Sequence, residues 1–138
     1  MAGIGSKACG WDVVVVKDAG NVPLTAVAKT ATFVSAAINI PEASFLGVQV
    51  LVASVTGTSP TLDVSLQVSF NGTNWATLQD AQSSFSGQGV IALDQLTAAG
   101  SSFMQCMFGG VYLRLNFVLG GTSPSFTITG RVMIKNNL

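Results

Sequence analysis

The sequence predicts an all-β domain, an antiparallel two-sheet sandwich of the jelly-roll type with about eight strands. Apolar and polar residues alternate with a period of two from end to end, and no run of more than a few residues has a helical period. Hydrophobic residues make up 49% of the 138 residues and charged residues 9%. This composition supplies a core for one domain and excludes an intrinsically disordered chain, because disorder requires low hydrophobicity and high charge.

The chain begins with a segment of small residues. Residues 1–10 (MAGIGSKACG) contain no apolar run long enough for a signal peptide, and we expect a flexible arm followed by a single sandwich domain at residues 11–138. Without an export signal the protein is expected to stay in the cytoplasm where it is made and not to be secreted. Cys9 and Cys106 are then expected to be reduced thiols that behave as small hydrophobic residues.

Residues 47–55 form a predicted strand whose two faces are both apolar. One face carries Val48, Val50 and Val52, and the other carries Leu51, Ala53 and Val55. Such a strand is either central in the fold or covered by a partner, so we select Leu51 and Val55 as candidate contact residues. Weaker alternation predicts further strands at residues 11–16, 30–40, 75–78 and 89–93.

Three other predicted strands alternate between apolar and polar residues. The clearest is residues 62–70, where every second residue is apolar, up to and including Phe70. The same pattern occurs at residues 111–119 and at residues 126–134. It is typical of antiparallel strands with one face in the core and one face in water.

A short sequence occurs twice in the chain. Residues 57–60 and 121–124 both read Gly-Thr-Ser-Pro, and each copy joins two of the predicted strands. Gly adopts a positive φ and Pro starts a strand where its missing N–H is harmless, so both copies are expected to be hairpin turns. The repeat indicates either convergent turn chemistry or a sandwich whose halves are related by a pseudo-symmetric arrangement of hairpins.

Residues 94–110 are the one stretch without regular alternation, and Asp94 could cap a short helix at its start. The stretch contains two Phe and two Met within six residues, namely Phe103, Met104, Met107 and Phe108. On the surface these side chains would form an adaptable contact patch for another protein. Packed beneath the sandwich they would belong to the core, and the sequence leaves both alternatives open.

The residues needed for catalysis are missing or scattered. The chain contains no histidine, and its six Lys and Arg residues are balanced by six Asp and Glu residues with no tight spacing. Neither a Gly-x-Ser-x-Gly elbow nor a zinc-type Cys and His cluster occurs. We therefore expect no enzyme activity, no cofactor, no metal and no nucleic-acid partner. The longest charge-free run, residues 43–62, contains Gly and Pro, so we expect no membrane-spanning helix and no membrane partner.

Residues 55–78 and 112–124 resemble a known group of proteins. The first segment contains Gly-Thr-Ser-Pro-Thr-Leu-Asp-Val followed by Ser-x-Asn-Gly-x-x-Trp, and the second contains Tyr-Leu-Arg-Leu-Asn before the second Gly-Thr-Ser-Pro. These strings resemble small β-rich virion proteins of tailed bacteriophages. In its size and its single domain the chain is most similar to the capsid decoration, or cement, proteins among them.

The resemblance implies a structural protein on the capsid surface of a virion, with the major capsid protein as its partner. Such a protein binds the outside of the shell and stabilises contacts between capsomers, and it has no catalytic residues. The apolar composition also favours a homo-oligomer, either a dimer or a trimer. Two alternatives are a tail or baseplate protein and a carbohydrate-binding β-sandwich module, in which Trp11, Trp75 and Tyr112 would offer flat aromatic surfaces.

Overall fold

The computed structural model describes residues 7–8, 11–40, 43–80, 89–90, 92–107 and 111–136. Within these residues every regular element is a β-strand, and nine antiparallel strands belong to one sheet. The strands β8 (Gln79–Asp80) and β9 (Gly89–Val90) pair only with each other in this part of the chain. No helix long and apolar enough to cross a membrane occurs among the described residues. The predicted all-β antiparallel fold is confirmed.

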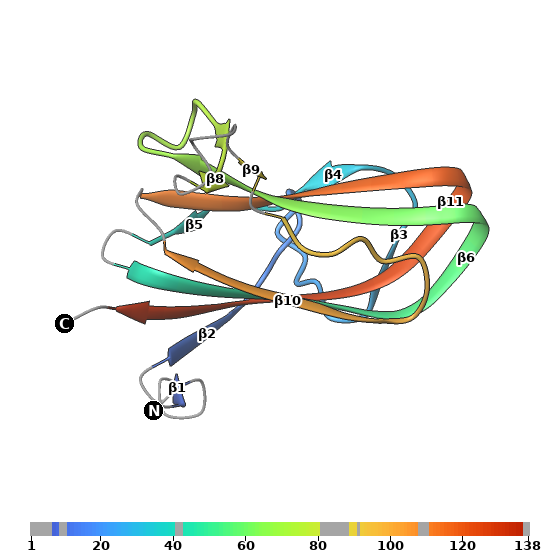
Figure 1. Cartoon of the computed structure of the whole chain (residues 1–138), viewed down its shortest axis with the longest axis horizontal. Helices are drawn as coiled ribbons and strands as arrows, with labels where there is room; N and C mark the ends of the chain where they lie inside the picture. The colour runs from blue at the N-terminus through green and yellow to red at the C-terminus, as the bar shows by residue number, and fades with distance from the viewer. Residues whose placement is uncertain are drawn as a thin grey trace.

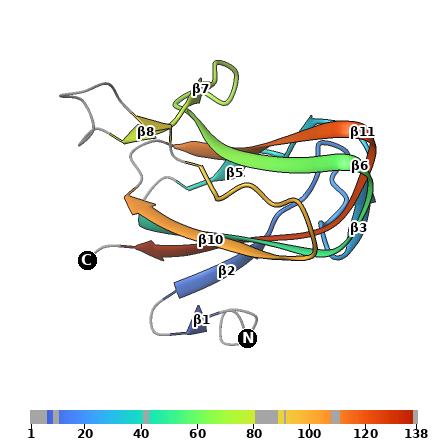
Figure 2. The same ribbon diagram turned by 45° about the vertical axis from the view of Figure 1, so that its right-hand side comes forward.

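Two long strands organise the sheet (Figure 1). β6 (Ala43–Ser69) and β11 (Tyr112–Asn136) pair with each other from the Tyr112–Ser69 pair to the Asn136–Ala43 pair. Both strands bend near their middle, and the sheet folds back over itself to make two facing layers (Figures 1 and 2). The two sheets of the predicted sandwich are therefore two halves of one curled sheet.

Each layer contains one half of β6 and one half of β11, flanked by shorter strands. The β10 layer has the order β1 (Lys7–Ala8), β2 (Trp11–Val15), β11, β6 and β10 (Gly100–Met107). In the β4 layer, β11 pairs with β4 (Phe33–Val34) and β5 (Ile38–Asn39), and β6 pairs with β7 (Ala76–Thr77). β3 (Val27–Lys29) pairs with β11 just after its bend. The predicted N-terminal arm lies outside the described residues except for the two residues of β1.

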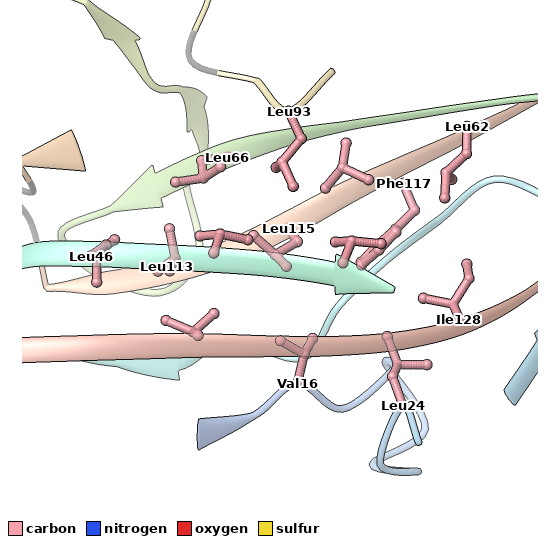
Figure 3. Packing of buried hydrophobic residues seen from close by; sticks show 14 of the residues in the cluster. Val16, Leu24, Leu46, Leu62, Leu66, Leu93, Leu113, Leu115, Phe117 and Ile128 are labelled. Carbon is pink, nitrogen blue, oxygen red and sulfur yellow. The ribbon is translucent and has the colours of Figure 1, made fainter. Parts of the chain in front are cut away.

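Buried side chains from both long strands fill the space between the layers (Figure 3). The alternation predicted from the sequence holds over most of their length, and the fully buried residues include Leu46, Val48, Leu62, Leu66, Leu113, Leu115, Phe117 and Ile128. Val16, Leu24 and Leu93 from the connecting segments complete the core. Burial of one such side chain contributes about 1.5–3 kcal/mol, so this core is the main source of stability.

The two Gly-Thr-Ser-Pro copies form the bend of the sheet. Thr58 of the first copy pairs with Thr122 of the second. Positive φ angles occur at equivalent positions of the two copies, namely 115° at Gly57, 100° at Gly121, 50° at Ser59 and 48° at Ser123. Each copy carries its strand around a corner from one layer to the other and does not reverse it, so the predicted hairpin turns are wrong. The repeat is pseudo-symmetric, with the two copies paired across a local two-fold axis.

Phe70 does not lie on the face where its strand pattern placed it. Phe70 was expected in the core but is 76% exposed. β6 ends at Ser69, whose hydroxyl oxygen accepts hydrogen bonds from the backbone N–H groups of Asn71 (3.2 Å) and Gly72 (2.8 Å), and the turn directs Phe70 to solvent.

Val55 was expected on the outer face beside Leu51 but packs against the core. The cause is a β-bulge at Ala53, because Thr127 pairs with Ser54 while the next residue, Ile128, pairs with Val52. One extra residue in a strand moves every following side chain to the opposite face.

The segment expected to be irregular is largely regular. Gly100–Met107 forms strand β10, which pairs with β6 from Gly100–Val52 to Met107–Phe45, and no helix begins at Asp94. The segment at residues 30–40 is divided between β4 and β5, whereas β3 was not predicted.

Candidate contact surface

The outer face of the β10 layer carries the largest group of exposed apolar side chains in the described part of the chain. Strand register defines this face, because residues paired across an antiparallel sheet point to the same side. Its side chains from β2, β11, β6 and β10 include Val13, Val15, Arg131, Met133, Lys135, Phe45, Gln49, Leu51 and Phe103.

The exposed fractions of its large hydrophobic side chains distinguish this face from the rest of the described chain. Val15 and Phe45 are each 39% exposed, and Phe103 is 50% exposed. The other exposed large hydrophobic residues of the described chain are Val22, Phe70 and Val118, of which Val22 and Phe70 lie in connecting segments and Val118 on the β4 layer. Single exposed apolar residues are ordinary on protein surfaces, whereas a group of them on one face is a candidate interaction site.

Gly47 lies near the centre of this face and shapes it. A Cβ atom at Gly47 would lie 3.2 Å from ring carbons of Phe103 and 3.2 Å from the terminal methyl group of Met133. The Phe103 and Met133 side chains therefore approach each other over the glycine backbone. Because Gly47 has no side chain, the apolar side chains of Phe103 and Met133, which come from different strands, form one continuous surface.

The structure divides the six predicted contact residues. Phe103 and Leu51 lie on the outer face, while Met104 and Val55 pack against the core. The backbone of Met107 pairs with Phe45, but its side chain and all of Phe108 lie outside the described residues. Successive residues of a strand face opposite sides, so Phe103 lies on the surface while Met104 packs against the core.

Sequence reasoning missed Val15, Phe45 and Met133. The signal for Val15 was available, because four successive valines at residues 13–16 make both faces of that segment apolar, as in residues 47–55. Phe45 continues the outer alternation of residues 47–51 toward the N-terminus. Met133 lies between Val132 and Ile134, so this short segment is also apolar on both faces, although Arg131 and Lys135 make its outer face otherwise polar.

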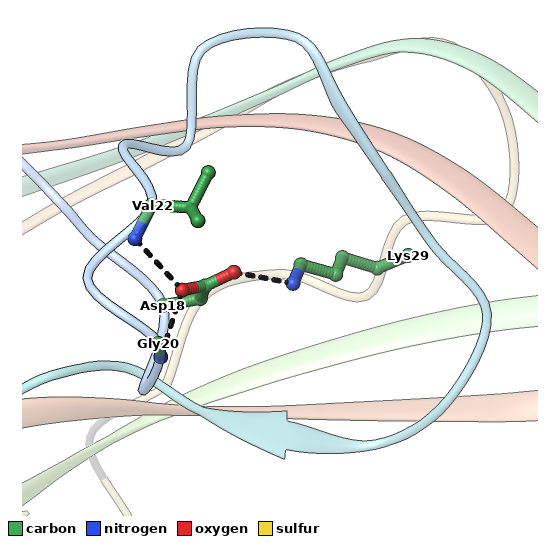
Figure 4. Close-up of polar contacts among 4 residues, drawn as sticks. All are labelled: Asp18, Gly20, Val22 and Lys29. Atoms are coloured by element: carbon green, nitrogen blue, oxygen red, sulfur yellow. Dashed lines mark hydrogen bonds and ion pairs between the residues drawn. The ribbon is translucent and has the colours of Figure 1, made fainter.

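Asp18 forms the centre of a compact polar cluster (Figure 4). One carboxylate oxygen accepts hydrogen bonds from the backbone N–H groups of Gly20 and Val22, both at 2.9 Å, and the other accepts one from Lys29 Nζ at 2.7 Å. Lys29 Nζ also lies 4.9 Å from the centre of the Phe33 ring. These contacts hold the connection between β2 and β3 against the β4 layer. The role of the Asp18 cluster is therefore structural.

The pKa of Asp18 lies below the 3.8 of an unperturbed aspartate, first because Lys29 donates a hydrogen bond and then because Val22 does. Because the folded-state pKa is the lower one, the unfolded chain binds more protons in acid, and the stabilisation present above about pH 4 is lost as the pH falls through the folded-state pKa. We expect the Asp18→Asn variant to melt several degrees below the wild type at neutral pH. The gap should narrow in thermal melts toward pH 2, and a constant gap would contradict this prediction.

Arg114 covers the aromatic residue that a carbohydrate-binding site would use. Its guanidinium carbon lies 4.4 Å from the centre of the Trp75 ring, and its Nε donates a 2.6 Å hydrogen bond to Gln67 Oε1. Desolvation lowers the pKa of Arg114. The Tyr112 ring packs near Gly72, and the Trp11 side chain is outside the described residues. One face of Trp75 is thus occupied by protein.

Cys106 is a half-buried free thiol in the core-facing row of β10. Burial raises its pKa to about 11, so it remains protonated and is a poor nucleophile at neutral pH. Among the described residues no group of three His, Cys, Asp or Glu side chains could hold a metal ion.

Comparison with protein-family models and with curated proteins finds no match for this sequence. Several solved structures are similar to the chain at low sequence identity. The PBSX exported protein XepA has a TM-score of 0.52 at 12% identity over 91% of this chain, which spans 46% of XepA. The SPBc2 prophage-derived protein YomS has a TM-score of 0.48 at 10% identity, over 90% of this chain and 91% of YomS. A carbohydrate-binding module of Cellvibrio mixtus lichenase 5A, in complex with cellotriose, has a TM-score of 0.38 at 10% identity, over 96% of this chain and 91% of that one.

Proposed function

We propose that this protein is a non-enzymatic structural component of a tailed-bacteriophage virion that binds the outside of the capsid and stabilises contacts between capsomers. The observation that carries the proposal is the apolar outer face of the β10 layer, with Val15, Phe45 and Phe103 exposed. The fold shared with the PBSX protein XepA and the resemblance of residues 55–78 to phage virion proteins support the same assignment.

The geometry of this face suits repeated weak binding. The four strands pack on one core and are hydrogen-bonded to one another, so little conformational entropy is lost when this face meets a partner. Its apolar centre is flanked by Arg131 and Lys135, which favours a partner surface with apolar and acidic groups. Many copies on one shell add their modest affinities through multivalency, so that each contact can be weak while the shell becomes hard to open.

A matched pair of substitutions tests the proposal. Val15 and Val118 are 39% and 40% exposed, and they lie on the outer faces of opposite layers. In co-sedimentation with undecorated capsids, we expect the Val15→Glu variant to bind at least about tenfold more weakly than the wild type, because a carboxylate is desolvated in the contact. The Val118→Glu variant should bind like the wild type and protect the shell from heat equally well.

Three outcomes would argue against the proposal. If the wild type does not sediment with capsids and gives them no heat resistance, a decoration role is wrong. If the protein sediments with purified tails instead, the tail or baseplate alternative replaces it. If Val118→Glu weakens binding as much as Val15→Glu does, the β10 layer is not the contact surface.

A further inference from the structure

Strand β10 forms one edge of the main sheet. The order of the sheet ends at β10, which pairs with β6 on one side through all eight of its residues. Its sequence, GSSFMQCM, contains no charged residue and no proline. On its other side the backbone N–H and C=O groups of every second residue point away from β6, as they do in any edge strand.

Within the residues that the structure describes, the other margins of the sheet are protected in ways that β10 is not. In the β4 layer the flanking strands β4, β5 and β7 are only two residues long. At the far side of the β10 layer, β1 pairs with the start of β2, where Lys7 is the register partner of Asp12. Short strands and charged residues are the usual means by which proteins prevent edge-to-edge pairing. A long, neutral edge strand is the usual site of strand addition.

We propose that β10 pairs in antiparallel fashion with β10 of a second copy of this chain, about a two-fold axis perpendicular to the β10 layer. In such a pair, opposite residues must point to the same face, so an outward residue meets another outward residue. The register centred on Phe103 satisfies this condition. It places Phe103 beside Phe103 of the partner subunit and Ser101 opposite Gln105 of the partner subunit.

Three arguments favour a second copy of this chain as the partner that pairs with the free edge of β10. Two copies of one strand carry the same charges, so a neutral strand such as β10 can pair with itself without charge repulsion. The half-exposed Phe103 ring would be covered by the same ring of the partner, in a cross-strand aromatic pair. The pairing would also join the outer faces of two β10 layers into one continuous surface.

Exchanging charges at two positions tests both the dimer and its register. Ser101 and Gln105 are exposed on the outer face of β10, so that substitutions there leave the core unchanged. The double variant Ser101→Lys with Gln105→Lys would place like charges opposite each other twice in the dimer. The control variant, Ser101→Lys with Gln105→Glu, would place opposite charges in the same two positions.

Sedimentation velocity of the full chain at micromolar concentration, without capsids, is the measurement. We expect a wild-type dimer, an increase of at least about tenfold in the dimer dissociation constant for the Lys/Lys variant, and recovery in the Lys/Glu variant. Thermal melts of all three proteins check folding. A wild type that is monomeric or trimeric, or a Lys/Lys variant as dimeric as the Lys/Glu variant, would overturn the proposal. Because no capsid is present, this result is independent of the proposed decoration role.

Discussion

Gly121→Ala is expected to lower the free energy of unfolding by about 3 kcal/mol or more. A Cβ atom at Gly121 would lie 2.5 Å from the carbonyl oxygen of Ser59 and 2.8 Å from that of Thr58, and the φ of +100° is strained for any other residue. Both oxygens belong to the backbone of the other long strand. The clash can be relieved only by separating β6 from β11 at the bend, where the two layers are joined.

Because the bend is pseudo-symmetric, the equivalent substitution in the other Gly-Thr-Ser-Pro copy should have a similar effect. A Cβ atom at Gly57 would lie 2.8 Å from the Ser123 carbonyl oxygen and 2.9 Å from Pro124 Cα, so Gly57→Ala should destabilise the fold by a similar amount. The double variant should lose less than the sum of the two, because one separation of the strands relieves both clashes.

Urea denaturation followed by circular dichroism measures these changes, and Gly20→Ala is the control. Gly20 has no positive φ, and its added Cβ would lie 3.4 Å from the Asp18 carboxylate, an ordinary contact. We expect Gly20→Ala to stay within about 0.5 kcal/mol of the wild type. If Gly57→Ala and Gly121→Ala were equally mild, the corner would not be the constrained element described above.

The bend also shows how far the sequence predicts the fold. The two Gly-Thr-Ser-Pro copies identified where the chain turns and indicated that the two places are related. Glycine with a positive φ followed by proline suits both a reversal of direction and a corner, because both require the same local backbone. The difference is set by what the following strand pairs with. Thr58 pairs with Thr122 of the other copy, a contact between distant residues that local patterning does not encode.

Burial was predicted well where a strand is regular and poorly where its register changes. The alternation at residues 62–68 and 113–117 identified the buried residues of the β4 layer, because the side-chain period of a strand is two. Val55 was assigned to the wrong face because one bulged residue, Ala53, reverses the alternation without any mark in the sequence. Phe70 was misassigned because the strand ends one residue earlier, at the Ser69 turn.

The contact surface could be predicted only in part. Phe103 and Leu51 were selected from local composition, and both lie on the outer face of the β10 layer. This face is assembled from four strands that are distant in sequence, each of which contributes one or two apolar side chains of the described residues. Val15 and Met133 become part of it only through the pairing of β2 with β11, and Phe103 reaches Met133 only across Gly47.

Phe117→Ala is expected to lower the free energy of unfolding by about 3–5 kcal/mol, a large part of the stability of a typical domain. Phe117 is fully buried in the β4 layer, and its ring stacks on Phe33 with centroids 4.5 Å apart and planes 4° from parallel (Figure 3 shows Phe117 within the core). The substitution leaves a cavity and removes the stacked pair. It also deprives Phe33, over which Lys29 lies, of its support from the core.

A double-mutant cycle separates the ring pair from the cavity. We expect Phe117→Leu and Phe33→Leu each to destabilise the protein, with a coupling energy of about 0.5–1.5 kcal/mol, because either change alone removes the stack. Phe70→Ala is the matched exposed control and should change stability by no more than about 0.5 kcal/mol in the same urea titration. A coupling energy near zero would mean that Phe117 acts only through its volume. In that case the contacts that join Asp18, Lys29 and Phe33 would not be energetically coupled to Phe117 in the core.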